Sequence, residues 1–332
     1  MKGYITLDYE LGMGKITGTP EKCLIEPMNY LTEMTDKYGI KLNIFVDAAY
    51  ILRLIKLKEQ FPILDQDLKI VTDHIRKLDA EGHSIQLHLH PQWCYSTFDG
   101  VKWILDMEHY KLSDMPFEEQ KQLIKDGVAI LNSLTSRKVS TFRAGGYSLN
   151  NYSELYDVFI SEGITKDTSV LRGEYSKGKY QTYDYRKVPN KTSYRVSSDI
   201  KIEDNGGNMT EYPISTIRTL SIVYLLNKWK RHYEYSDIIV PKIKWGDGQG
   251  IGYSGNKCQI LLNKIKMLFG KKSIRASIDI GVDLENVYSY SRKHYEGDNF
   301  VIIGHPKAIS PFAISVLERF VINHPEIEFT VF

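Results

Sequence analysis

Cysteine is scarce in this sequence: Cys23, Cys94 and Cys258 are the three examples in 332 residues. Three widely spaced thiols can build neither a disulfide framework nor a four-thiolate zinc site. Secreted domains that are held together by disulfide bonds are therefore excluded. A reducing compartment suits this composition, and we expect a cytoplasmic protein.

Long apolar runs and an excess of charge of one sign are also missing. The longest apolar stretch covers residues 220–226 and contains Ser221, whereas a membrane-spanning helix needs about 20 apolar residues. Asp8 and Glu10 come too early to leave room for the apolar region of a signal peptide. The 43 Lys and Arg nearly balance the 41 Asp and Glu, which leaves no global field to attract nucleic acid. We therefore expect no transmembrane segment, no signal peptide and no nucleic-acid partner.

The first half of the chain alternates short β-rich runs with longer segments whose apolar residues recur every three or four positions. The expected strands cover residues 4–7, 42–46, 84–90 and 140–143. The expected helices cover residues 20–37, 65–80, 118–134 and 152–162. This alternation predicts an α/β fold, in which crossover helices join parallel strands.

The alternation breaks between about residues 172 and 270. This stretch is polar and rich in Gly and Tyr, and we interpret it as a large insertion with loops and one long helix at 217–233. Beyond it the patterns return, with a helix at 283–295, a strand at 300–303 and a helix at 311–323. We therefore predict one domain over residues 1–332 that carries the insertion 172–270.

Two histidines, His88 and His90, stand two positions apart at the end of the strand expected at 84–90. Side chains alternate across a strand, so both imidazoles leave one face with their Cα atoms about 6.5–7 Å apart. One zinc ion could bind both rings, since it sits about 2.0–2.1 Å from each nitrogen. Pro91 ends the strand and places the pair at the carboxyl edge, where α/β proteins keep their active sites. The alternative is a histidine pair of the surface or the core.

Two carboxylates, Asp8 and Glu10, follow the first expected strand with the same spacing. They point to one side of the chain and could supply a metal ligand and a general base. A solvated strand end is the alternative.

Arg143 and His305 end two further expected strands. Gly145 and Gly146 follow Arg143; glycine lets the backbone approach a ligand closely, and an arginine can hold a carboxylate through two hydrogen bonds. A plain turn and a structural histidine are the alternatives. Because the motifs end successive strands, we expect them to meet on one rim of a barrel or sheet.

Four motifs occur in a familiar order: Thr6-Leu-Asp8-Tyr-Glu10, Gly82-His-Ser-Ile-Gln-Leu-His88-Leu-His90-Pro, Phe142-Arg143-Ala-Gly-Gly and Gly304-His305-Pro-Lys. With them the chain resembles the polysaccharide deacetylase (NodB-homology) family. It resembles in particular the WalW-like branch, which is found with lipopolysaccharide and capsule synthesis genes. The similarity spans about residues 3–171 and 279–320 and leaves the insertion unmatched.

The resemblance implies an irregular (β/α)7-type barrel and the metal-dependent removal of an N-acetyl group from a sugar. The implied cofactor is a divalent metal, Zn²⁺ first, with Co²⁺, Ni²⁺ or Fe²⁺ as alternatives. The implied partner is an N-acetylated sugar, a nucleotide sugar or a lipid-linked saccharide. The residues that match the family's roles are the base Asp8, its partner Arg143, the general acid His305, and the metal ligands Glu10 and His88. His90 is the candidate for the remaining metal ligand.

Three further residues next to the motifs are candidates for substrate binding. Trp93 and Tyr147 could stack on a pyranose ring, or they could cap the core instead. Gly145 could let the backbone come close to the sugar.

Two departures from the family pattern leave questions open. The family's second histidine commonly stands four residues after the first, where this chain has Gln92, so His90 is the nearby substitute. The common Asp-Asp pair is replaced by Asp8 and Glu10, so either carboxylate could be the ligand and the other the base. Two rival hypotheses remain. The protein could be a barrel hydrolase that acts on another C–N or glycosidic bond, or a carbohydrate-binding protein that has lost its catalytic activity.

Overall fold

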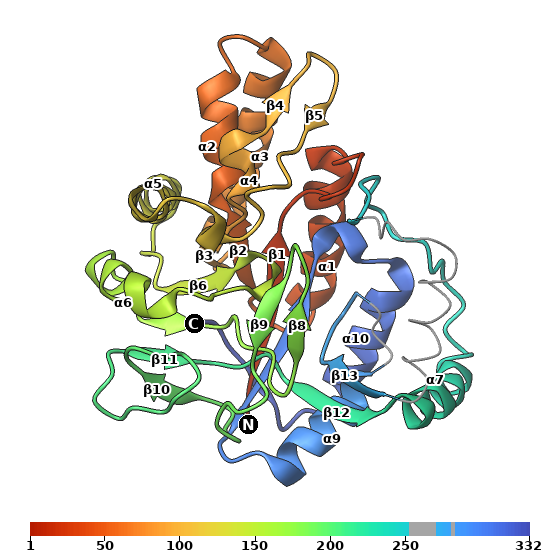
Figure 1. Ribbon diagram of the computed structural model, residues 1–332. Coiled ribbons are helices and arrows are strands. Elements are labelled where there is room, and N and C mark those ends of the chain that lie inside the picture. The colour runs from red at the N-terminus through yellow and green to blue at the C-terminus, as the bar shows by residue number, and fades with distance from the viewer. Residues whose placement is uncertain (252–269, 280–282) are drawn as a thin grey trace, which may run out of the picture.

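A curled sheet of mostly parallel strands forms the centre of the computed structural model, which describes residues 1–251, 270–279 and 283–332. The nine-stranded sheet has the order β10-β11-β7-β6-β3-β2-β1-β14, with β15 beside β1. Helices lie along the outside of the curled sheet (Figure 1). This half-barrel of parallel strands with helices confirms the expected α/β barrel class.

The strands have these bounds: β1 Lys2–Tyr9, β2 Asn43–Asp47, β3 Ser84–Leu89, β4 Thr97–Phe98, β5 Trp103–Ile104, β6 Thr141–Ala144, β7 Lys166–Asp167, β8 Tyr175–Lys177, β9 Thr182–Asp184, β10 Tyr194–Val196, β11 Met209–Glu211, β12 Thr216–Leu220, β13 Lys271–Arg275, β14 Asn299–Gly304 and β15 Glu328–Phe329. The α-helices have these bounds: α1 Glu26–Asp36, α2 Ala48–Leu57, α3 Pro62–Ala80, α4 Gln92–Tyr95, α5 Phe117–Leu134, α6 Tyr152–Ser161, α7 Ser221–Glu234, α9 Leu284–His294 and α10 Pro311–Asn323. Shorter helical turns are η1 Glu21–Ile25, η2 Leu112–Asp114, η3 Gly145–Tyr147 and η4 Pro306–Ala308.

The sequence explains why the central strands are buried on both faces. In β1 seven of eight residues are buried, and in β2 and β3 all are. Strands of parallel sheets are commonly buried on both faces, and here the buried positions include polar residues such as Gln86 and His88. Local signals set the helix ends: Ser310 caps α10 by accepting a hydrogen bond from the amide of Ala313 at 3.2 Å, and Pro311 occupies the first turn.

Irregular backbone, rather than regular strands, joins β7 to β14 across the open side of the sheet. The amide of Ile214 donates to the carbonyl of Val170 at 3.0 Å, and the amide of Ser215 donates to the carbonyl of Val301 at 3.1 Å. This bridging explains why the barrel is irregular.

One expectation for the region 172–270, the helix start at residue 217, is wrong. Residues 217–220 belong to β12 rather than to a helix, because Thr216–Leu220 pairs antiparallel with Lys271–Arg275. The helix α7 starts only at Ser221. The region also contributes to the central sheet, since β11 pairs with β7. Cys258 lies outside the described residues.

The remaining expected strands and helices are present within a few residues of their predicted ends. The helix α2 was not anticipated, although its buried Ile51 and Leu54 follow helical spacing. Among the described residues, no helix has the length and apolar character needed to cross a membrane.

Candidate active site

Four strand ends carry the sequence motifs to one rim. The strands β6, β3, β2, β1 and β14 are neighbours in the sheet and run parallel. His88 pairs in register with Arg143, and Leu7 pairs with Gly304. Because parallel strands present their carboxyl ends at the same edge, the expected meeting of the motifs on one rim is confirmed.

Glu10, His88 and His90 form a buried group in which one ligand atom from each residue lies within 4.8 Å of the others. The Oε2 atom of Glu10 lies 2.5 Å from Nε2 of His90 and 3.2 Å from Nε2 of His88. One carboxylate and two imidazoles form a donor set that suits Zn²⁺ and related divalent ions. The arrangement could hold a divalent metal.

A main-chain contact orients His88 for such a role. Its Nδ1 atom lies 2.8 Å from the carbonyl oxygen of Arg143. A carbonyl only accepts, so Nδ1 must donate, and the lone pair of the neutral ring is left on Nε2, which faces Glu10. Such outer hydrogen bonds commonly fix metal-binding histidines. The residues present therefore fit a metal.

His90 has a comparable neighbour in Gln92. The amide nitrogen of Gln92 lies 3.4 Å from Nδ1 of His90, while the buried Oε1 atom of Gln92 has no hydrogen-bond partner. A half-turn of the amide would exchange the two atoms and let Oε1 accept from the Nδ1–H group of His90. Gln92 thus lies beside His90 and outside the group formed by Glu10, His88 and His90.

Charges around Glu10 favour its ionised form. Burial opposes ionisation, but the Lys307 ammonium, 2.9 Å from Oε1, and His90 hold the pKa of Glu10 well below its usual range. Burial also opposes the charged form of His88, yet Asp8 and Glu10 outweigh it and raise the pKa of His88 to about 9. A metal that binds here must displace that proton.

Asp8 and Arg143 form a buried ion pair beside this group. The Nη1 atom of Arg143 donates to Oδ1 of Asp8 at 2.7 Å. Other donors of the guanidinium bind Thr6 and Thr168, and its Cζ atom lies 4.3 Å from the ring centre of Phe45. Burial works against the charge of Asp8, but Arg143 outweighs it and lowers the pKa of Asp8.

His305 faces Asp8 from β14. Its Nε2 atom lies 3.5 Å from Oδ2 of Asp8, and its Nδ1 atom lies 2.7 Å from Oδ2 of Asp279. The other oxygen of Asp279 accepts the main-chain amide of His305 at 2.7 Å. Burial opposes protonation, but Asp279 raises the pKa of His305. A carboxylate thus stands opposite an imidazole whose protonated form Asp279 favours.

Sequence reasoning missed the contributions of Asp279 and Lys307. Asp279 lies 26 positions before His305, and no local spacing connects the two. Lys307 belongs to the quoted motif, but nothing in the sequence shows that it reaches back to Glu10. The pairing of β1 with β14 brings Lys307 to Glu10, and an isolated bridge between Ser277 and Ile303 brings Asp279 to His305.

The expectation that Trp93 stacks on a sugar is not supported. Trp93 has no exposed surface and donates its Nε1–H group to Oδ2 of Asp47 at 2.8 Å. Its ring packs against Tyr50 and Trp103. The alternative holds, in which this residue caps the core.

Gly145 and Tyr147 lie at the rim, but their surroundings differ from the expectation. A Cβ atom on Gly145 would lie 2.5 Å from the carbonyl oxygen of Leu89 and 3.0 Å from the ring of His90, so the close approach is to the chain itself. Tyr147 has a φ of 60° and is buried. The Arg275 guanidinium lies 4.8 Å from its ring centre, which leaves little of the ring to stack on a sugar.

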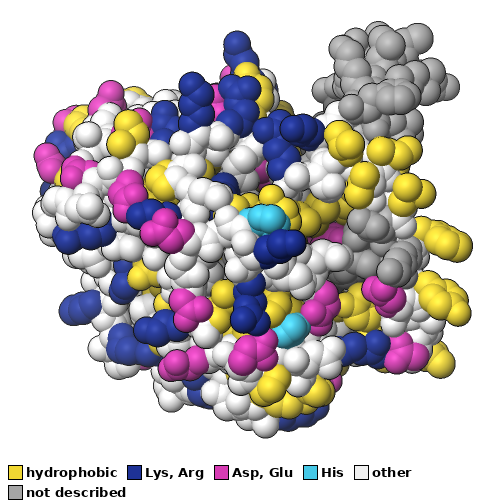
Figure 2. Space-filling view, turned by 90° about the horizontal axis from the view of Figure 1, so that it is seen from below, with side chains coloured by type: hydrophobic (Ala, Val, Ile, Leu, Met, Phe, Trp, Pro, Cys, Tyr) yellow, Lys and Arg dark blue, Asp and Glu magenta, His cyan; other side chains and the backbone are white. Residues whose placement is uncertain are grey.

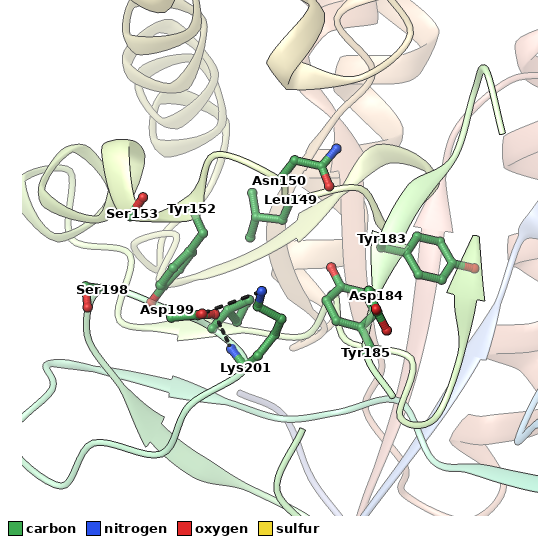
Figure 3. Close-up of a pocket in the computed structure, with 11 residues that line it drawn as sticks. Leu149, Asn150, Tyr152, Ser153, Tyr183, Asp184, Tyr185, Ser198, Asp199 and Lys201 are labelled. Atoms are coloured by element: carbon green, nitrogen blue, oxygen red, sulfur yellow. Dashed lines mark hydrogen bonds and ion pairs between the residues drawn. The ribbon is translucent and has the colours of Figure 1, made fainter. Parts of the chain in front are cut away.

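A separate cavity of about 150 Å³ lies near α6 and β9. Tyr152, Tyr183 and Tyr185 border it, together with the ion pair of Asp199 and Lys201 (Figure 3). None of the motif residues lines it. The cavity is therefore distinct from the rim site.

Comparisons with known proteins give no close relative. No family model matches the sequence, and no curated protein matches it. Among solved structures, a candidate polysaccharide deacetylase from Mycobacterium smegmatis has a TM-score of 0.48 at 13% identity, over 97% of this chain and 82% of that one. A 4-alpha-glucanotransferase from Thermococcus litoralis has a TM-score of 0.46 at 12% identity, and the match covers 100% of this chain and 39% of the glucanotransferase chain. An allantoinase has a TM-score of 0.45 at 13% identity, and the match covers 100% of this chain and 86% of the allantoinase chain.

All three TM-scores lie below 0.5, and the three proteins are named for different reactions. These likenesses do not decide between the reactions. The assignment of a reaction therefore depends on the geometry of the site.

Proposed function

We propose that this protein is a metal-dependent hydrolase that removes an N-acetyl group from a sugar or a saccharide precursor. One observation carries the proposal: Asp8 and His305, each with its own charged partner, face each other beside the Glu10, His88 and His90 group. Amide hydrolysis needs a base that activates water and an acid that protonates the leaving amine. This site offers both.

The base is Asp8. Arg143 keeps this carboxylate ionised and holds it through Oδ1, which leaves Oδ2 to accept a proton from the attacking water. Because the guanidinium is also fixed by Thr6 and Thr168, the carboxylate keeps its orientation. The pair supplies a positioned base at neutral pH.

The acid is His305. Asp279 accepts from Nδ1, so the proton on Nε2 points toward Asp8 and the space where the substrate nitrogen would lie. A sugar amine is too basic to leave unprotonated, and the Nε2 proton would pass to it as the C–N bond breaks. Asp279 stabilises the charged ring before transfer.

Glu10, His88 and His90 would hold the metal, with Zn²⁺ as the first choice and Co²⁺, Ni²⁺ or Fe²⁺ as alternatives. When bound, such an ion lowers the pKa of a water molecule and stabilises negative charge on the acyl oxygen. This assignment makes Glu10 the metal carboxylate and Asp8 the base. Lys307 supports it by occupying Oε1 of Glu10 and leaving Oε2 toward the imidazoles.

A glycosidase fits the site less well. Glycosidic cleavage commonly uses one carboxyl group that stays protonated because its pKa is raised. Both central carboxyl groups, Asp8 and Glu10, have lowered pKa values. Against a carbohydrate-binding protein without turnover, the proposal relies on the base Asp8 and the acid His305, which binding alone would not need.

The biological setting remains part of this proposal. We propose a role in surface polysaccharide biosynthesis, in the cytoplasm, on a nucleotide sugar or a lipid-linked saccharide. Cell fractionation checks the location, and recovery of the native protein outside the cytoplasmic membrane would contradict it.

The direct test is acetate release from N-acetylated nucleotide sugars and lipid-linked saccharides by metal-loaded protein. Asp8→Asn is the matched control, because it keeps the shape of the side chain and leaves Glu10, His88 and His90 in place. We expect acetate from the wild type only, with equal metal content in both proteins. Release of reducing sugar or opening of a cyclic amide, without acetate, would replace the proposal with one of its rivals.

A further inference from the structure

We infer that α7 docks on the surface of an anionic lipid membrane. The helix presents a continuous apolar stripe to solvent. Its exposed members are Leu220 just before the helix and Ile222, Val223, Leu225, Leu226, Trp229 and Tyr233 within it. Trp229 is 81% exposed and Leu226 is 67% exposed.

The stripe is one face of the helix rather than a scatter of apolar residues. Positions 222, 226, 229 and 233 follow the spacing of four, three and four that keeps side chains on one side of an α-helix. The opposite side packs on the protein, where Ser221 and Tyr224 are buried. Figure 2 shows apolar side chains standing out along the right edge of the molecule, the side on which α7 lies in Figure 1.

Charge complementarity selects the partner. The described residues 217–251 and 270–275 contain nine Lys and Arg against three Asp and Glu, whereas the whole chain contains 43 against 41. Arg218 is exposed on β12, and Lys271 is exposed on β13 opposite Leu220. An apolar helix face with Trp, set in a basic segment, is the pattern of helices that lie in the interface of anionic bilayers.

The ribbon of β12 and β13 connects this helix to the rim. Leu220 pairs with Lys271 at the helix end, and Thr216 pairs with Arg275 at the other end, beside Tyr147. Five strand residues span roughly 13 Å. A docked helix would therefore keep the rim close to the lipid headgroups, which suits a lipid-linked saccharide; this last point rests on the proposed function, whereas docking does not.

Vesicle binding tests the inference without any activity assay. The full chain is mixed with vesicles of phosphatidylcholine alone or with added phosphatidylglycerol, and bound protein is measured by sedimentation. We expect binding to the anionic vesicles that weakens with salt, and little binding to the neutral ones. Absence of binding to anionic vesicles would overturn the inference.

Trp229 provides a second readout in the unmodified protein. Trp93 and Trp103 are buried, and Trp245 is half-buried and stacked on Tyr30. The fluorescence emission of these three rings should therefore change little on vesicle binding. We expect the emission of the wild type to shift to the blue on anionic vesicles, and we expect the shift to vanish in Trp229→Phe. A shift that persists in Trp229→Phe would contradict docking through α7.

The double variant Leu226→Glu/Trp229→Glu should bind anionic vesicles about tenfold more weakly or worse, since each change removes the gain from burying a large apolar side chain. Val101→Glu is the matched control, because Val101 is 88% exposed but lies in the turn between β4 and β5. Circular dichroism and metal content check that both variants fold. Equal binding by the double variant and the wild type would refute the inference. Conversion of a dimer to a monomer in the double variant, with vesicle binding unchanged, would assign the face to a second copy instead.

Discussion

Lys307 and Glu10 form an ion pair in which Nζ lies 2.9 Å from Oε1. The ammonium also donates to the carbonyl oxygen of Leu11 at 2.6 Å, so its position is fixed by the main chain. One oxygen of Glu10 is thereby occupied, and the other faces His88 and His90. The longer glutamate therefore presents a single oxygen to a metal.

The ligand set predicts different outcomes for His90→Ala and Gln92→Ala. His90→Ala removes a donor and should abolish stoichiometric binding of Zn²⁺. Gln92→Ala removes only the neighbour of Nδ1 and should keep one metal per chain with an affinity about 10–100-fold lower, the usual effect of losing an outer hydrogen bond. Elemental analysis and calorimetric titration measure both quantities. Full metal retention in His90→Ala would refute this ligand set.

His305→Ala should separate proton donation from metal binding. We expect turnover of an N-acetyl sugar to fall by roughly 10²–10⁴, the usual worth of general acid catalysis, with metal content unchanged. An activated acetyl ester, whose alcohol leaves without a proton, should lose much less. The comparison of the two substrates is the measurement. Equal losses on both would show that His305 does not protonate the leaving group.

The fit of Gly145 against β3 predicts that Gly145→Ala disturbs the metal site. The new methyl group would press on the carbonyl of Leu89 and on the ring of His90. We expect a stability loss of about 1–3 kcal/mol, as for other overpacked positions, and a weaker affinity for Zn²⁺. Gly250→Ala is the control, because nothing lies within 4 Å of its added Cβ. Denaturant unfolding and metal titration that show equal effects of the two variants would contradict the prediction.

The buried carboxyl pair of Glu211 and Asp167 predicts a pH dependence of stability. These residues pair in register between β11 and β7, and burial, with Asp167 beside it, raises the pKa of Glu211 well above its usual 4.5. The folded state thus holds a proton that the unfolded state releases. The contribution of this proton to the free energy of unfolding is fully present below about pH 4.5, and it is lost as the pH rises toward the pKa of Glu211 in the folded state. Its size is about 1.4 kcal/mol for each unit by which the folded pKa exceeds the unfolded one.

Glu211→Gln should remove this decline, because an amide donates to Asp167 at any pH. Denaturant unfolding between about pH 5 and pH 9 measures the two slopes. Glu118→Gln on the exposed start of α5 is the control and should keep the wild-type slope. If Glu211→Gln and the wild type lose stability in parallel, the pair does not hold the proton.

Much of the fold and of the rim could be predicted, because short β-rich runs that end at turn residues alternate with segments of helical apolar spacing. Once those strands are parallel, residues at their ends must meet, as Asp8, His88 and Arg143 do. The partner of His305 could not be predicted, since Asp279 approaches through an isolated bridge between Ser277 and Ile303.

The directions in which side chains point were the second feature that the sequence could not predict. The position of Trp93 beside the histidine motif says nothing about where its ring points, and the buried acceptor on Asp47 decides it. The start of α7 was misplaced for a related reason. The strand pairing of Thr216–Leu220 depends on residues 271–275, which are distant in the sequence.

The contact between His88 and the carbonyl oxygen of Arg143 has a consequence for variation at this position. The carbonyl belongs to the main chain, so any amino acid at position 143 can supply it, whereas the bond to Asp8 needs the arginine side chain. A single substitution there would disable the base and spare the orientation of the ligand. Metal retention alone is then no evidence of turnover, and an inactive descendant of this chain could carry its metal indefinitely.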